Sequence, residues 1–314
     1  MMIEISIIIP VRNQKDSLLA ALNSLRRQIK KPRLFEVVIC DDNSDDGTGD
    51  AVKKLRYPIF LKYFINNPPL GRAANRNLGF EKSVGKELIF IDGDMVPGDN
   101  FLEAMLGDSD LDSVKVGHAQ PPPDENTTGL NRYLYSRGRY ASTTVGEKLP
   151  GKYFTSNNFY ISRQNFQKLG GFDTNFTGWG GEDIDFGLRL ESENIAIKNA
   201  ADAITYHYHK RNIKSLVDDF TDFGSNSFDY LVSKHPEFLR QIPGNVLGLT
   251  RSSNPLDLLY KLISLFTINS GSLGLTKAIV QSLPNLNWPD FIYDYILWGN
   301  LALGYKRRVN SGGK

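Results

Sequence analysis

We expect the chain to fold as an α/β protein, in which a mainly parallel β-sheet is flanked by helices and a helical region follows. Three observations predict this. Short apolar runs rich in β-branched residues are typical of buried strands. These runs alternate with helical patterns, as in sheets whose parallel strands are joined by helices. Several runs end in polar clusters, and such sheets bind their ligands at the carboxyl ends of the strands.

The first third of the chain shows the alternation most clearly. Leucines at 18, 19, 22 and 25 form the apolar stripe of the first helix. In chain order we predict strand Ile5–Pro10, helix Ser17–Gln28, strand Phe35–Cys40, helix Asp50–Leu55, strand Ile59–Ile65, helix Gly71–Ser83 and strand Glu87–Ile91. The polar clusters 10–13, 41–46 and 92–94 follow three of these strands, at the predicted ligand-binding edge.

The composition changes at the proline-rich connector 121–126, which a tyrosine- and arginine-rich segment, 131–140, follows. We predict a strand at 154–162, helices at 163–169 and 182–193, and a short strand at 204–208. From Ser215 the pattern is helical, with breaks near Pro243, around 271–274 and at Pro284. We therefore expect one domain over residues 1–215, with halves 1–120 and 121–215. A helical region over 216–314 and a disordered tail at 310–314 complete the chain.

The overall composition and charge limit the classes of function that the protein can have. The 314 residues are 40% hydrophobic and 23% charged, as in ordinary globular proteins, and the formal net charge is +2. That charge, without a dense basic stretch, argues against nucleic-acid binding. The single cysteine, Cys40, lies in an apolar run, which fits a core position in a cytoplasmic protein. We see no signal peptide, and no apolar run approaches the ~18 residues of a spanning helix.

Two acidic pairs follow predicted strands. Asp92-Gly93-Asp94 comes after the apolar run 88–91, where two carboxylates can bind Mg²⁺ or Mn²⁺ and leave positions for phosphate oxygens. A plain β-turn uses the same residue types. Asp41-Asp42 can accept hydrogen bonds from a base or a ribose hydroxyl, whereas the following residues, 44–46, suit the N-cap of the next helix.

Trp179-Gly180-Gly181-Glu182-Asp183 is the strongest single signal. The glycines let the chain bend, and the tryptophan offers a flat apolar platform of the kind that packs on a sugar. A carboxylate that opens a helix is held ionised by the helix dipole, as a general base must be. The alternative interpretation is an acidic helix cap.

Arginine and histidine side chains are the remaining candidates for site residues. The segment 71–79 opens a helix with small residues that permit close backbone approach, and its arginines can bind a diphosphate; solvated arginines on a packed helix are the alternative. His207 and His209 share one face of a predicted strand, so either can complete a metal site, although two surface histidines fit the same pattern. His118 and His235 lack such context, and we expect structural roles for them.

These motifs, in this order, resemble glycosyltransferase family 2, the inverting enzymes with the GT-A fold. The segments 7–13, 37–48, 71–79 and 91–94 are similar to the nucleotide-sugar half of that family, with Asn75 where alanine is usual. Phe172 and the segment 178–183 resemble the acceptor-side motif of members that transfer galactose or N-acetylgalactosamine, including chondroitin-polymerase-like enzymes. The resemblance covers about residues 3–215 and does not extend to the last hundred residues.

The resemblance implies roles for individual residues. The donor, a UDP-sugar, would bind at Pro10, Arg12, Asn13, Asp41, Asp42, Gly71, Arg76, Asp92 and Gly93. Asp92, Asp94 and His207, with His209 as second choice, would hold Mn²⁺ or Mg²⁺. Trp179, Gly180 and Gly181 would bind the acceptor or sugar, Asp183 would act as base, and Glu182 would hold a sugar hydroxyl. A hexose, of the galactose or N-acetylgalactosamine type, would move with inversion to a glycan or lipid-linked glycan hydroxyl, as in polysaccharide biosynthesis.

Two other function classes stay open. A nucleotidyltransferase also pairs a parallel sheet with acidic metal ligands, but such enzymes usually have a glycine-rich loop after the first strand, and residues 10–14 contain no glycine. A non-catalytic carbohydrate-binding protein of the same fold would not need Asp92, Asp94 and Asp183. The aromatic segment 291–298, followed by the basic residues 306–308, is either a helix packed on the catalytic domain or a peripheral contact with the inner face of the membrane.

Overall fold

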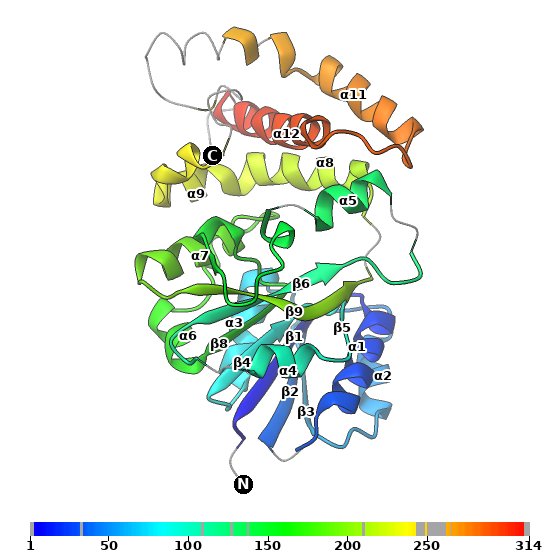
Figure 1. Ribbon diagram of the computed structural model, residues 1–314, viewed down its shortest axis with the longest axis vertical. Coiled ribbons are helices and arrows are strands. Elements are labelled where there is room, and N and C mark those ends of the chain that lie inside the picture. The colour runs from blue at the N-terminus through cyan, green and yellow to red at the C-terminus, as the bar shows by residue number, and fades with distance from the viewer. Residues whose placement is uncertain are drawn as a thin grey trace. The chain divides into compact units, whose positions relative to one another are not determined.

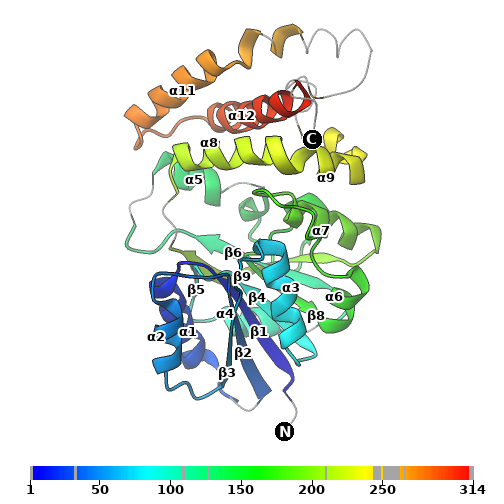
Figure 2. The ribbon, with the colours of Figure 1, turned by 180° about the vertical axis from the view of Figure 1, so that it is seen from behind.

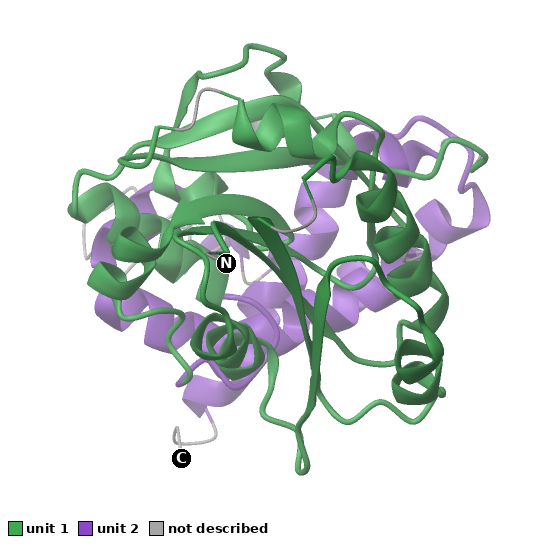
Figure 3. Cartoon of the chain, turned by 90° about the horizontal axis from the view of Figure 1, so that it is seen from below, with its two compact units in different colours: residues 1–125, 135–174, 182–210 green, residues 126–134, 175–181, 211–314 purple. Residues whose placement is uncertain are grey.

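The structure, a computed structural model, describes residues 3–31, 34–107, 110–125, 128–136, 138–208, 211–242, 249, 262–264 and 266–310. The chain divides into two units, which we describe separately (Figure 3). Unit 1 comprises residues 1–125, 135–174 and 182–210, and unit 2 comprises residues 126–134, 175–181 and 211–314.

Unit 1 is built on a sheet that has nine strands within the described ranges, in the order β3-β2-β1-β4-β8-β6-β9-β5, with β7 paired to β9. The strands are β1 (Ile5–Val11), β2 (Phe35–Asp41), β3 (Phe60–Ile65), β4 (Glu87–Ile91), β5 (Met95–Pro97), β6 (Val114–Gln120), β7 (Lys148–Leu149), β8 (Asn158–Ser162) and β9 (Ile197–His207). The first four in sheet order are parallel, whereas β8 runs antiparallel to β4 and β6. The predicted α/β architecture is confirmed.

Helices cover both faces of this sheet (Figures 1 and 2). One face packs against α1 (Lys15–Gln28), α2 (Thr48–Lys54) and α4 (Phe101–Leu106), and the other against α3 (Arg72–Lys82), α6 (Arg163–Leu169) and α7 (Glu182–Ser192). Alternate residues of β1 face opposite layers, so Ile7 belongs to the first core and Ile8 to the second, and both are fully buried. Cys40 lies in the second core as predicted, and burial raises its pKa to about 12.

The parallel register aligns the carboxyl ends of the strands. Val11 lies opposite Asp41, and Asp41 lies opposite Ile65. The residues that follow β1, β2 and β3 therefore meet at one edge of the sheet. Gly93, just past β4, joins them, because its N–H donates to Pro10 O over 3.1 Å. The predicted clustering of the polar segments is thus present in the structure.

The second half of unit 1 departs from the predicted elements. The short strand predicted at 204–208 is the end of β9, which runs for 11 residues. Its burial does not alternate regularly, and its pairing with β6 shifts register between Gly117 and His118. This irregularity hides the strand from period-two patterns. Neither β5 nor β6 was predicted, and β8 begins at Asn158 rather than at 154.

Unit 2 is helical in its described part. It contains most of α5 (Gly129–Tyr135), then α8 (Ile213–Asp222), the π-helix η4 (Phe223–Ser227), α9 (Phe228–Lys234), the 3₁₀-helix η5 (Pro236–Arg240), α11 (Ser270–Ser282) and α12 (Asp290–Asn310). The break predicted around 271–274 lies slightly earlier, at 268–269, where the Asn269 side chain accepts hydrogen bonds from the N–H groups of Gly271 and Ser272 and caps α11. α11 ends before Pro284, as predicted. The break at Pro243 and residues 311–314 lie outside the described residues.

The aromatic segment 291–298 lies within α12. Tyr293, Ile296 and Leu297 are at most 1% exposed and pack with α8. Arg308 donates hydrogen bonds to the carbonyl groups of Ser225 and Asn226. Of the two interpretations of this segment, the packed helix therefore describes it, although its neighbour in the packing is α8 of unit 2. Among the described helices, none is both long and apolar enough to cross a bilayer.

Candidate active site

Hydrogen bonds join two loops at the carboxyl edge of the sheet. Asn13 adopts a left-handed conformation with φ of 54°. Its backbone N–H donates to Ser44 Oγ over 2.8 Å, and its side-chain Oδ1 accepts from the Asp45 N–H over 2.9 Å. The Arg12 side chain, which follows β1 directly, is exposed. The loop after β1 is thus held against the loop after β2, with a guanidinium left at the surface.

Asp41 and Asp42 accept hydrogen bonds from neighbouring groups at the same edge of the sheet. Asp41 Oδ2 accepts from the Tyr63 hydroxyl over 2.6 Å. Asp42 Oδ1 accepts from the N–H of Leu70 over 2.6 Å, and Oδ2 accepts from the N–H of Gly71 over 3.0 Å. Asp42 therefore fixes the approach to α3, which begins after Gly71 at a φ of 86°. Asp42 Oδ1 also accepts from the Asn66 side-chain amide over 3.3 Å, so it is saturated, whereas Asp42 Oδ2 and both oxygens of Asp41 can each accept one more hydrogen bond.

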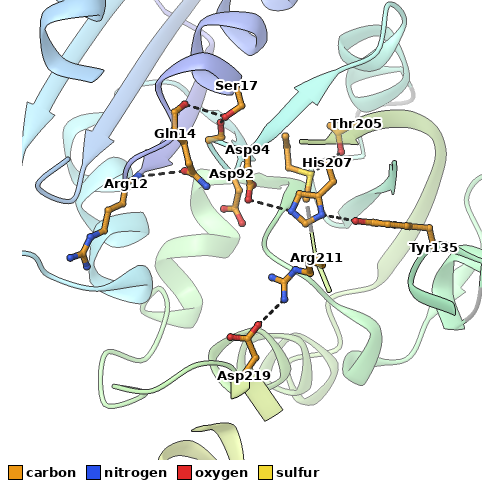
Figure 4. Close-up of polar contacts among 12 residues, drawn as sticks. Arg12, Gln14, Ser17, Asp92, Asp94, Tyr135, Thr205, His207, Arg211 and Asp219 are labelled. Carbon is orange, nitrogen blue, oxygen red and sulfur yellow. Dashed lines mark hydrogen bonds and ion pairs between the residues drawn. The ribbon is translucent and has the colours of Figure 1, made fainter. Parts of the chain in front are cut away.

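Asp94 and His207 meet at the end of β9. The antiparallel pairing of β5 with β9 sets Met95 opposite His207, so Asp94 lies next to the histidine. Asp94 Oδ2 is 3.2 Å from His207 Nε2, and their side chains are only 18% and 10% exposed. The other ring nitrogen, Nδ1, is 2.7 Å from the hydroxyl oxygen of Tyr135. Figure 4 shows these three side chains in a row, with Asp92 beside Asp94. The distance between β5 and β9 in the sequence explains why no local pattern gives this contact.

Arg76 connects the acidic turn after β4 with the start of α7. Its Nη2 lies 2.9 Å and 3.1 Å from the two carboxylate oxygens of Asp92. Its Nη1 lies 3.7 Å from Glu182 Oε1, and the Arg76 side chain is 5% exposed. The guanidinium carbon also lies 5.5 Å from the centroid of the Phe172 ring. Arg76 was predicted at the donor, and it lies between two carboxylates of the candidate site.

The electrostatics of this cluster follow from its burial. Burial and the neighbouring Asp183 raise the pKa of Glu182 to about 7, although the charge of Arg76 lowers it. Burial raises the pKa of Asp92 as well, against the opposing effect of Arg76. Burial alone lowers the pKa of Arg76, but the carboxylates of Asp92, Asp183 and Glu182 outweigh it and raise the pKa overall. Glu182 is therefore about half protonated near neutral pH, while Arg76 keeps its charge.

Asp183 is the more accessible of the two carboxylates that open α7. Its Oδ2 accepts from the Ser156 N–H over 3.1 Å. Several buried polar atoms of this cluster have no hydrogen-bond partner among the described residues: Arg76 Nε and Nη1, Glu182 Oε2 and Asp183 Oδ1. Unsatisfied buried polar atoms are costly, and here they belong to the residues predicted to bind donor and acceptor. Such atoms are expected where a polar ligand binds.

The donor atoms suit a divalent cation that also holds phosphate. Asp94 and His207 already converge, and Asp92 is close enough that the charge of Asp94 raises the pKa of Asp92. In the described ranges no three His, Cys, Asp or Glu side chains form a complete metal cage. Mg²⁺-type sites usually take one or two protein carboxylates and complete their shell with phosphate oxygens and water. His209 lies outside the described residues.

Trp179 is held from several sides within unit 2. Its backbone N–H donates to Asp222 Oδ2, and its ring centroid is 5.7 Å from that of Phe220. The Arg211 guanidinium carbon is 5.9 Å from the ring centroid. Gly180 and Gly181 follow with φ of 77° and 98°, and a Cβ on Gly181 would come within 2.7 Å of the Phe176 ring. Both glycines are therefore required by the turn that precedes α7, as predicted from their freedom to bend.

Sequence reasoning missed three residues that support the candidate site. Tyr135 contacts His207, Ser156 contacts Asp183, and Asp222 contacts Trp179. Tyr135 lies in the tyrosine- and arginine-rich segment 131–140, which stood out only by composition. Nothing local marks Ser156, because its backbone N–H makes the contact, nor Asp222, which lies 43 residues from its partner.

The sequence matches two protein families. The match to "Glycosyl transferase family 2" covers residues 6–170, and the match to "N-terminal domain of galactosyltransferase" covers residues 137–212. Validoxylamine A glucosyltransferase of Streptomyces hygroscopicus subsp. limoneus is 28% identical over 282 residues, which are 76% of this chain and 58% of that protein. Chondroitin synthase of Pasteurella multocida (strain Pm70) is 28% identical over 239 residues, which are 65% of this chain and 25% of that protein. The chain thus spans only part of the length of these relatives.

One of the solved structures that resemble the chain covers its whole length. Mannosyltransferase PcManGT from Pyrobaculum calidifontis, in complex with GDP-Man and Mn²⁺, superposes with a TM-score of 0.65 at 14% identity. The superposition covers 100% of this chain and 89% of the other. At that identity the likeness shows the fold alone, which is the predicted GT-A fold.

Proposed function

Because this chain belongs to glycosyl transferase family 2, we propose that it transfers a hexose from a UDP-sugar to a hydroxyl of a glycan or lipid-linked glycan, with inversion at the anomeric carbon. The observation that carries the proposal is the grouping of charged side chains at one edge of unit 1. Asp94 lies against His207, and Arg76 joins Asp92 to Glu182, which precedes Asp183. Carboxylates, an imidazole and a buried arginine in this arrangement suit a diphosphate leaving group and a deprotonated acceptor.

We assign the proton transfer to Asp183. The Ser156 N–H fixes one of its oxygens, while the other, Oδ1, has no partner among the described atoms. An acceptor hydroxyl would donate its proton there as its oxygen attacks the anomeric carbon. Glu182 is more deeply buried, at 6% exposure, and is half protonated near neutral pH. We propose that Glu182 holds a sugar hydroxyl, for which a protonated carboxyl is both donor and acceptor.

The metal ligands would be Asp94 and His207, with Asp92 as a third. A divalent cation bound there would neutralise the diphosphate as it leaves. An imidazole ligand favours a transition metal such as Mn²⁺ over Mg²⁺, which prefers oxygen. Arg76 would hold Asp92 in place and bring a fixed positive charge close to the leaving group. His207 is oriented by Tyr135, as metal-bound imidazoles usually are by their second nitrogen.

The identities of the donor and of the acceptor rest on the sequence motifs and on the similar proteins. The edge formed by Pro10, Arg12, Asn13, Asp41 and Asp42, with Gly71 and Gly93, would bind the nucleotide, and a UDP-sugar is the donor that the sequence motifs favour. The mannosyltransferase with GDP-Man makes a GDP-sugar the competing donor. The galactosyltransferase match supports a galactose or N-acetylgalactosamine type sugar. Trp179, Gly180 and Gly181 would bind the acceptor, and the lone buried thiol of Cys40 fits a cytoplasmic enzyme.

Asp183→Asn and Glu182→Gln test the assignment of the base. Asn keeps the size of Asp183 and its hydrogen bond to Ser156 but cannot take a proton. We expect Asp183→Asn to bind UDP as wild type does and to lose ~10²–10⁴ in metal-dependent donor turnover. Glu182→Gln should lose much less, because Gln can still donate and accept hydrogen bonds. The reverse order of the two variants would assign the base to Glu182.

A further inference from the structure

Unit 2 exposes a group of large apolar side chains on one short part of the chain. Residues 262–291 contribute Leu262, Ile263, Phe266, Leu275, Ile279, Leu283, Leu286 and Phe291, nearly half of all exposed large apolar side chains in the described ranges. Phe266 is 81% exposed, Phe291 67% and Leu275 65%. A soluble monomer rarely exposes so many in one stretch, and such surfaces usually mark an interaction site. We call these eight residues the 262–291 patch.

In helix α11 the exposed apolar side chains lie opposite the buried ones. Leu273 and Val280, two turns apart, are 1% and 4% exposed and face inward. Leu275 and Ile279 lie one turn apart on the opposite side, at 65% and 45% exposure. The helix is therefore apolar on two sides, of which only one is used for packing in unit 2.

The charged side chains within residues 262–289 are all of one sign. The sequence from 262 to 289 contains no Asp or Glu, and its one charged residue is Lys277. Lys306 of α12 reaches the other end of the patch, with Nζ 3.4 Å from Ser264 Oγ, next to Ile263. The first carboxylates beyond it, Asp290 and Asp294, are bonded to Arg132 and Tyr133. The patch thus combines exposed aliphatic and aromatic groups with lysines.

We propose that the 262–291 patch is a docking surface for an anionic phospholipid bilayer, on which α11 lies in the interface. Apolar side chains would enter the acyl boundary while Lys277 and Lys306 face the phosphates. A second copy of the chain is a poorer occupant, since two patches brought together would oppose lysines, and residues 262–289 supply no carboxylate to pair them. Of the segment 291–298 only Phe291 belongs to the patch, whereas Tyr293, Ile296 and Leu297 are buried. The proposal does not depend on the transferase activity.

Vesicle co-sedimentation of the full chain tests the proposal. We expect binding to vesicles of phosphatidylcholine with phosphatidylglycerol and weaker binding to phosphatidylcholine alone. The double variant Leu275→Ser/Ile279→Ser should bind at least ~10-fold more weakly, given the free energy of burying two large side chains. The matched control is Leu111→Ser/Val145→Ser in unit 1, whose side chains are similarly exposed at 50% and 58%. It should bind as wild type does.

A fluorescent label reports contact without depending on the stability of the double variant. Cys40 is buried, so Ser282→Cys, on the outer side of α11, can be labelled selectively with an environment-sensitive dye. Anionic vesicles should shift its emission to the blue, whereas the same dye at Glu81→Cys, exposed on α3, should not respond. No binding by wild type, undiminished binding by the α11 double variant, or an unchanged dye would each overturn the proposal. A dimer that the α11 double variant abolishes, without vesicle binding, would assign the patch to a contact between copies.

Discussion

The buried carboxyl of Glu182 should make the stability of the protein depend on pH in a predictable direction. Its pKa is about 7 in the folded protein against an ordinary value of 4.5. Between these values the unfolded chain releases the proton while the folded protein keeps it, so the folded state binds more protons. The free energy of unfolding therefore falls as pH rises through this window, and the full loss is reached only above the folded pKa.

The size of the effect follows from the two pKa values. The difference between the two pKa values corresponds to roughly 3 kcal/mol in total, most of which falls between pH 5 and pH 8. Glu182→Gln removes the titration and keeps the size of the side chain. The free energy of unfolding of the variant minus that of wild type should therefore rise by roughly 2 to 3 kcal/mol from pH 5 to pH 8.

Urea unfolding at a series of pH values, followed by circular dichroism, measures this difference. Glu193→Gln serves as control, because Glu193 lies just past α7, is 47% exposed and pairs with Lys168. Its difference from wild type should stay nearly flat over the same range. A Glu182→Gln difference that changes by less than ~0.5 kcal/mol would refute the account of Glu182 as a buried carboxyl held partly protonated.

Three further predictions rest on single contacts. Tyr135→Phe removes the hydrogen bond to His207 and should weaken Mn²⁺ binding about 10–100-fold, as measured by titration calorimetry. Tyr140→Phe, the control, should leave the affinity for Mn²⁺ unchanged. Equal affinities in the two variants would mean that Tyr135 does not orient His207. Arg76→Met leaves the buried carboxylate of Glu182 and the partly buried carboxylate of Asp92 without their cation. It should lower the free energy of unfolding by about 3–5 kcal/mol at pH 8, so a loss below ~1 kcal/mol would contradict the ion-pair geometry. Gly181→Ala should lower the free energy of unfolding by about 1–3 kcal/mol, because φ is 98° and the Phe176 ring blocks the methyl group. Gly274→Ala, whose methyl group would lie in open space on α11, should raise it by about 0.5–1 kcal/mol. Similar shifts of the thermal unfolding temperature in both variants would argue against the strained turn at Gly181.

The elements whose pattern is local were predictable. The strands β1, β2 and β4 are continuous apolar runs, and their register alone places Asp42 and Asp92 at one edge. The start of α7 was predicted at Glu182, because an acidic pair after two glycines is a signal within six residues. These are the parts of the site that the sequence resolves.

The rest depends on contacts between distant segments. The neighbours of His207 are Asp94, 113 residues away, and Tyr135, 72 residues away. No window of sequence contains such a pair, and β9 carries too irregular a burial pattern to place its last residue in advance. The ion pairs of Arg76 were missed for the same reason. In unit 2 the aromatic segment 291–298 has the composition of an interface, but packing against α8 decided its burial.

The central claim, transfer of a sugar from a nucleotide donor by this metal and carboxylate arrangement, is tested most directly by the nucleotide product. The full chain is incubated with Mn²⁺ and a panel of labelled UDP-sugars and GDP-sugars, and the released nucleotide is identified by chromatography. We predict a nucleoside diphosphate, UDP from one UDP-hexose, that requires the metal and is abolished in Asp94→Ala. Release of pyrophosphate would instead indicate a nucleotidyltransferase, and donor binding without release of any nucleotide would contradict the catalytic account.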